Sequence, residues 1–224
     1  MTERPFVHVL ALRLDPAWRR LPEADRAEDV TALRVAVERA ARRVTTYTYS
    51  MVGLRAEADL LFWRMAAALE DLEEEASLLL RSGLGRWCAP AHAMVGLVRP
   101  STYTKRPTDQ EQAMLAGERS RYLIVYPFVK STEWYLTPHE ERQRVMAEHI
   151  RVGREYPMVR QCLAYSFGLD DQEFIVAYET DDLPAFQDLV MALRETESRR
   201  ATVRDTPILT GIHRPLEDAV RLLG

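Results

Sequence analysis

The order of predicted strands and helices repeats once along this chain, and that repeat constrains its fold more than any other feature. Short segments rich in β-branched and aromatic residues predict strands, and longer segments with apolar residues every three or four positions predict helices. In the first half we expect strands at 6–14, 44–52, 58–65 and 91–99 and helices at 26–43 and 66–81. In the second half we expect strands at 121–129, 160–167, 173–179 and 206–213, helices at 138–153 and 183–198, and a short closing helix at 215–222.

Both halves therefore have the βαββαβ order of a ferredoxin-like unit, in which two helices cover one face of an antiparallel sheet. The sequence predicts an α+β protein whose two halves pair their sheets into a barrel-like core, a dimeric α/β barrel within one chain. We expect an N-terminal half at 1–100, a linker at 101–120 and a C-terminal half at 121–224. The linker covers a stretch rich in Pro, Thr and Gln.

Composition excludes several classes of partner. The net charge of -4 gives no basic footprint for nucleic acid. Charged residues interrupt every apolar stretch before it is long enough to span a bilayer, so no membrane insertion is expected. The two cysteines, Cys88 and Cys162, are too few for a disulfide framework, which favours a reducing compartment, the cytoplasm.

Familiar catalytic motifs are absent. The chain has no phosphate-binding G-x-x-x-x-G-K-[ST], no H-E-x-x-H and no G-x-S-x-G. Its five histidines are scattered, without the pairing one helical turn apart that builds a metal site on a helix. A metal here would need mostly non-protein ligands, and a porphyrin supplies four of them.

His149 is the candidate metal ligand in the second half. Helical spacing places it with Val145, Met146 and Val152 along a mainly apolar stripe, with Gly153 one turn later leaving room beside it. A single histidine on such a stripe is more often a core residue, although haem ligation is an established use. Glu197, on the helix expected at 183–198, is a candidate acceptor for the ring N–H, or else a solvated surface residue.

A phenol and an ammonium group stand four residues apart at the end of the strand expected at 121–129. Tyr126 and Lys130 project from the same face if this strand is regular. Over an anionic ligand, Lys130 could pair with a carboxylate and Tyr126 could supply a phenol. The alternative is a strand end with a lysine that extends its ammonium group to solvent.

These same segments are similar to the chlorite dismutase-like family of haem proteins. The resemblance covers 120 to 214, with weaker similarity around Gly53 to Met65. The matching sequence motifs are Y-P-F-V-K-S-T-E-W-Y-L from Tyr126, R-x-x-x-M-x-x-H from Arg142, G-R-E-Y from Gly153, S-F-G-L-D-D-Q-E-F from Ser166, Y-E-T-D-D-L from Tyr178, L-R-E-T-E from Leu193 and D-T-P from Asp205.

The resemblance implies ferredoxin-like halves, a homopentamer, and one haem b or coproheme in the C-terminal half. It implies His149 as the axial ligand of the haem iron, Glu197 as its carboxylate partner and Arg194 as a propionate-binding residue. The Tyr-Pro-x-x-Lys element of the family's coproheme decarboxylases falls on Tyr126 and Lys130, and the distal position on Gln161.

Three functions remain open within this resemblance. The first is a coproheme decarboxylase, a haem-dependent oxidoreductase of haem biosynthesis that uses hydrogen peroxide, with Tyr126 as the radical relay and Gln161 in the distal pocket. The second is a chlorite dismutase, which needs a distal arginine; the adjacent Arg160 reaches that position with a different gap placement. The third is a non-catalytic haem-binding protein.

Overall fold

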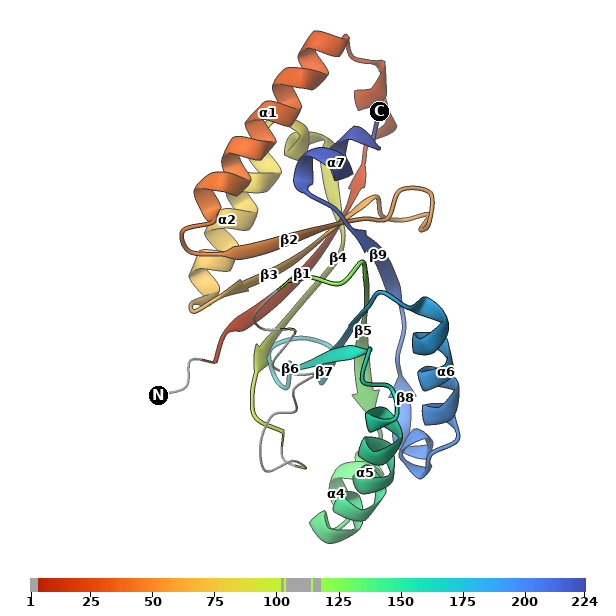
Figure 1. Cartoon of the computed structure of the whole chain (residues 1–224). Coiled ribbons are helices and arrows are strands. Elements are labelled where there is room, and N and C mark those ends of the chain that lie inside the picture. The colour runs from red at the N-terminus through yellow and green to blue at the C-terminus, as the bar shows by residue number, and fades with distance from the viewer. Residues whose placement is uncertain (1–3, 102, 104–113, 115–117) are drawn as a thin grey trace. The chain divides into compact units, whose positions relative to one another are not determined.

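The chain divides into two compact units. The computed structural model describes residues 4–101, 103, 114 and 118–224. One unit comprises residues 1–97 and 210–224, and the other comprises residues 98–209 (Figure 1). Each unit combines helices with antiparallel strands, so the α+β class is confirmed. Within the described residues, no helix has both the length and the apolar character that a membrane crossing requires.

The first unit is a ferredoxin-like βαββαβ unit. Its strands pair antiparallel in the order β4, β1, β3, β2, and the helices α1 and α2 lie side by side (Figure 1). Short 3-10 helices, η1 (Pro16–Arg20) and η2 (Gly83–Trp87), follow β1 and α2. The elements are β1 (Phe6–Leu14), α1 (Glu23–Ala40), β2 (Thr45–Ser50), β3 (Leu60–Ala66), α2 (Leu69–Arg81) and β4 (Cys88–Val98), completed by α7 (Leu216–Arg221) and most of β9 (Leu209–His213).

The core of this unit explains why the apolar strand segments form a sheet. Every residue of β3 is buried, so this strand lies in the middle of the sheet between β1 and β2. Leucines of β1 and β3 pack with Trp18, Leu33 of α1 and Leu79 of α2 in one cluster. Burial of such side chains stabilises the unit by about 1.5–3 kcal/mol each.

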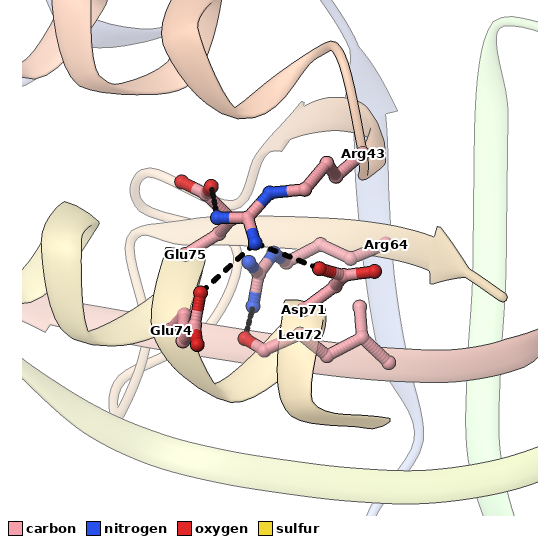
Figure 2. A network of polar contacts seen from close by, with 6 residues as sticks. All are labelled: Arg43, Arg64, Asp71, Leu72, Glu74 and Glu75. Atoms are coloured by element: carbon pink, nitrogen blue, oxygen red, sulfur yellow. Dashed lines mark hydrogen bonds and ion pairs between the residues drawn. The ribbon is translucent and has the colours of Figure 1, made fainter. Parts of the chain in front are cut away.

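A polar network ties α2 to the end of α1 and to β3 (Figure 2). Arg43 binds carboxylates along α2, reaching Glu75 at 2.7 Å and Glu74 at 2.9 Å. The guanidinium of Arg64 on β3 is almost fully buried and donates to the backbone carbonyl of Leu72 at 3.1 Å. Burial lowers the pKa of Arg64 to about 10, and the charge of Glu75 opposes that shift.

We expect Glu75→Gln to destabilise the protein by about 3 kcal/mol, because it removes the buried negative charge that compensates Arg64. Glu74 binds the same Arg43 but is exposed, so Glu74→Gln should change the free energy of unfolding by less than about 0.5 kcal/mol. Urea unfolding of both variants measures the difference. Equal effects would show that Glu75 acts only as a surface partner of Arg43.

The second unit carries the same order of its first elements. Its strands pair antiparallel in the order β6, β7, β5, β8, and α5 packs against α6. The elements are β5 (Tyr122–Lys130), α4 (Thr132–Leu136), α5 (His139–Arg154), β6 (Arg160–Tyr165), β7 (Phe174–Thr180), α6 (Leu183–Arg194), the 3-10 helix η3 (Glu197–Ala201) and β8 (Thr202–Arg204).

The structure differs from the expected organisation after residue 194. The helix expected at 183–198 ends at Arg194, and η3 and β8 follow it. The strand expected at 206–213 forms over Leu209–His213, where Ile212 and His213 pair with β2. Residues 210–224 therefore belong to the first unit rather than to a C-terminal half that runs to 224. Most of the linker expected at 101–120 lies outside the described residues.

Candidate functional site

A cavity of about 380 Å³ lies within the second unit. This volume is within the range of small-molecule sites. Nine aromatic side chains line it, together with five cationic ones and no Asp or Glu among the described residues. The cationic residues are Lys130, Arg142, Arg154, Arg194 and Arg199. A largely apolar cavity with several cations in its lining fits a large flat ligand that carries several carboxylates.

His149 faces this cavity from α5. Its Nδ1 lies 3.1 Å from the hydroxyl of Ser198 on η3, so Nε2 is the ring nitrogen left for a ligand. Burial, aided by the charge of Lys130, lowers the pKa of His149 to about 4. The ring is therefore neutral near pH 7, which is the form that binds a metal.

Gly153 lines the cavity one helical turn after His149. A Cβ added at this glycine would meet no atom within 4 Å. The open space that the sequence predicts beside the histidine is therefore present.

Lys130 lies at the end of β5, where its ammonium group is enclosed by aromatic rings. Its Nζ is 4.7 Å from the ring centroid of Trp134 and donates to the backbone carbonyl of Ser198 at 2.8 Å. Burial and the nearby charge of Arg199 lower the pKa of Lys130 to about 8. An anionic group in the cavity would reverse part of that shift, because an opposite charge favours the ammonium form.

Tyr126 lies on the same strand and also faces the cavity. Burial, and then interactions with Tyr178 that include a side-chain hydrogen bond, raise its pKa well above the ordinary value. Tyr126 therefore keeps its proton at any physiological pH. Gln161 on β6 lies opposite Tyr178 in the strand register and lines the same cavity.

Two of the arginines are held in place by one carboxylate. Asp205 binds Arg194 and Arg199, each at 2.7 Å. Arg142 is oriented differently, since its Nε donates to the backbone carbonyl of Thr137 at 3.1 Å. These fixed guanidinium groups suit the recognition of carboxylates in the cavity.

The site fits an iron porphyrin. His149 offers a neutral imidazole nitrogen as an axial ligand, the aromatic side chains offer apolar walls, and the cations offer partners for propionates. The described residues contain no cluster of three His, Cys, Asp or Glu side chains placed to hold a metal ion.

The family follows from comparison with known proteins. The family model described as chlorite dismutase matches residues 26–214. The chain belongs to the chlorite dismutase family. A coproheme decarboxylase from Mycolicibacterium smegmatis is 40% identical over 177 residues, which are 78% of this chain and 75% of that protein.

Solved chlorite dismutases share the fold. A variant of the enzyme from Candidatus Nitrospira defluvii has a TM-score of 0.89 at 28% identity, over 97% of this chain and 94% of that chain. The same enzyme in complex with imidazole has a TM-score of 0.88 at 28% identity, with the same coverage. This likeness supports the expected fold of two ferredoxin-like halves.

Most of the site residues expected in this member of the chlorite dismutase family come together. Tyr126, Lys130, His149, Gln161 and Arg194 all line the cavity. Their association follows from the strand and helix periodicities, which place each side chain on the inner face of its element.

Glu197 lies elsewhere, and its expected contact with His149 is wrong. Its carboxylate is exposed and binds Arg144 at 2.9 and 3.0 Å. The cause is the early end of α6 at Arg194, which places Glu197 at the first position of η3 and turns Ser198 toward His149.

Arg160 is also directed away from the cavity. Its guanidinium donates to the backbone carbonyl of Glu118 at 2.8 Å and to the hydroxyl of Ser120. Gln161 lines the cavity, whereas Arg160 does not.

Several lining residues receive no individual role from the sequence, although Arg154 and Tyr178 lie in the motifs that carry the resemblance. Arg154, Arg199, Ser198 and Tyr178 contribute to the cavity but stand outside the spacing arguments. That the described lining contains no Asp or Glu appears only when the side chains of distant segments are brought together.

Proposed function

We propose that this chain is a coproheme decarboxylase. It binds coproheme, an iron porphyrin with four propionates, and uses hydrogen peroxide to convert two of them to vinyl groups, which gives haem b. The observation that carries the proposal is the cavity that combines a neutral histidine with five cations and no described carboxylate. The coproheme decarboxylase of M. smegmatis, at 40% identity, supports it.

In this proposal, His149 would hold the iron of the porphyrin through Nε2. Lys130 and Arg194 would hold propionates, and the other cations of the cavity lining, Arg142, Arg154 and Arg199, would be available as further partners. The bound iron porphyrin supplies the redox chemistry with peroxide. Tyr126 would provide a protonated phenol to the reaction, and Gln161, which lines the same cavity, would contact the peroxide.

Mass spectrometry of the porphyrin tests this function. The purified protein is loaded with coproheme and titrated with hydrogen peroxide. We expect a species with three propionates, followed by haem b with two. Unchanged coproheme after peroxide addition would reject the decarboxylase function and leave a non-catalytic haem-binding protein.

Chlorite dismutation is the second candidate, because the family model and the solved structures carry that name. It needs a cation at the distal position, which the resemblance assigns to Gln161. The adjacent Arg160 binds Glu118 and Ser120 and does not line the cavity. We therefore expect the haem b complex to release little oxygen from chlorite. Rapid oxygen release measured with an oxygen electrode would favour chlorite dismutation instead.

Gly153 provides a test of the cavity that does not involve a reactive group. We expect Gly153→Leu to weaken coproheme binding strongly, because its side chain would enter the open space beside His149. The same change should stabilise the empty protein by up to about 1 kcal/mol, since leucine is a better helix former than glycine. Porphyrin titration and thermal unfolding measure the two effects. Gly153→Ala is the graded control, and full affinity in Gly153→Leu would place the porphyrin elsewhere.

We also propose a cytoplasmic homopentamer. The pentamer rests on the family resemblance, and the cytoplasmic location is supported by the free thiols of Cys88 and Cys162. Light scattering of the purified protein should give about five times the chain mass of 25.8 kDa. A stable monomer at micromolar concentration would contradict the assembly.

A further inference from the structure

Two buried hydroxyl groups, those of Ser198 and Thr196, form a series of hydrogen bonds that starts at His149. Its Nδ1 lies 3.1 Å from Ser198 Oγ, and Ser198 Oγ lies 3.1 Å from Thr196 Oγ1. Thr196 Oγ1 lies 2.8 Å from the backbone carbonyl oxygen of Leu193, in the last turn of α6. Ser198 and Thr196 are only 4% and 5% exposed, so solvent has little access to either hydroxyl.

The carbonyl oxygen of Leu193, the last acceptor in this series of hydrogen bonds, determines which atom donates in each of them. A carbonyl oxygen only accepts, so the Thr196 hydroxyl donates its proton to Leu193. Thr196 Oγ1 can then only accept a hydrogen bond from Ser198. The Ser198 hydroxyl therefore donates its hydrogen to Thr196 and has none left to donate to His149. Ser198 Oγ must in turn accept from His149, and this requires a hydrogen on Nδ1.

We infer that Ser198 and Thr196 are positioning residues that hold the neutral ring of His149 as its Nδ1–H tautomer. Nε2 then carries no hydrogen, and its lone pair is free for a ligand in the cavity. The tautomer of a histidine ligand is set by the hydrogen bond of its other nitrogen. Thr196 acts on the ring without touching it.

Lys130 holds Ser198 in place through the backbone of that serine. Its ammonium group donates to the backbone carbonyl of Ser198 at 2.8 Å. The hydroxyl of Ser198 is thus anchored to α5 through His149, while its backbone is anchored to β5 through Lys130. This geometry explains why a serine on a short 3-10 turn can orient the ring in place of a carboxylate.

The inference rests on the proposed function only in taking Nε2 as the atom that binds iron. The tautomer itself can be measured on the full chain without porphyrin, using ¹⁵N-labelled histidine and NMR correlations between ring nitrogens and ring carbon-bound protons near pH 7. The His149 signals are assigned by their loss in His149→Ala. Failure of the tautomer assignment is therefore distinct from failure of decarboxylation.

We expect the wild-type protein to show the Nδ1–H tautomer. Thr196→Val keeps the shape of the side chain but removes the acceptor for Ser198, whose hydroxyl can then donate to Nδ1. This variant should shift His149 toward the Nε2–H tautomer, and Thr196→Ser should retain the wild-type pattern. Ser198→Ala should also lose the preference for Nδ1–H.

Affinity for haem provides a second measurement. Ser198→Ala should weaken haem binding by about 10-fold or more, because the ring loses its orienting partner. A wild-type Nε2–H tautomer would overturn the inference without any variant. An unchanged tautomer in a folded Thr196→Val protein would also overturn it.

Discussion

His149→Ala should abolish the absorption spectrum of a five-coordinate, imidazole-ligated iron porphyrin while leaving the fold intact. The ring faces the cavity, and its one hydrogen bond in the described structure is to Ser198. Removing it deletes the proposed axial ligand but little of the packing of α5. Ultraviolet–visible and resonance Raman spectra of the ferric and ferrous complexes measure the effect, and circular dichroism checks the fold.

His139→Ala is the matched control, since His139 is an exposed histidine on the same helix outside the cavity. Its spectrum should equal that of the wild type. An unchanged ferric spectrum in His149→Ala would remove this histidine as the ligand, whatever activity the protein retains.

Tyr126→Phe should form the coproheme complex with near wild-type affinity yet lose decarboxylation by about 100-fold or more. The change removes a buried phenolic O–H and keeps nearly all of the ring packing in the cluster around Tyr178 and Leu189. The lost side-chain hydrogen bond with Tyr178 should lower stability by only about 1 kcal/mol. Porphyrin titration and mass spectrometry after peroxide addition separate binding from chemistry.

Lys130→Met provides the contrasting variant on the same strand. It keeps an unbranched side chain against Trp134 but deletes the charge and the donor to Ser198. We expect it to weaken or misorient coproheme binding, because it removes a partner for a propionate.

Decarboxylation at the wild-type rate by Tyr126→Phe would show that the tyrosine only contributes to packing, and haem binding without turnover would become the better hypothesis.

Periodicity in the sequence predicts much of the site. Tyr126 and Lys130 lie four residues apart on β5, and His149 and Gly153 lie four residues apart on α5; all four line the cavity. The expected strands and helices also agree with the structure through α5 and β7, because their apolar patterns match the sheet and helix faces that become buried.

Packing determines where α6 ends and to which unit residues 210–224 belong, and the periodicity of the sequence predicts neither. The apolar pattern alone does not show that α6 ends at Arg194, and this end removes Glu197 from His149 and brings Ser198 there instead. The assignment of residues 210–224 to the first unit likewise depends on the pairing of β9 with β2.

The amino-acid sequence by itself determined the α+β class, the candidate ligand His149 and the strand that presents Tyr126 and Lys130. These depend on local spacing, which the backbone converts directly into shared faces. The tertiary structure alone decided that Arg142, Arg154 and Arg199 join the cavity lining and that a series of hydroxyl groups connects His149 to Leu193, because both join side chains from segments far apart in sequence. Where a helix ends depends on packing against the rest of the chain, and the end of α6 at Arg194 rather than at 198 changes which side chain meets the histidine.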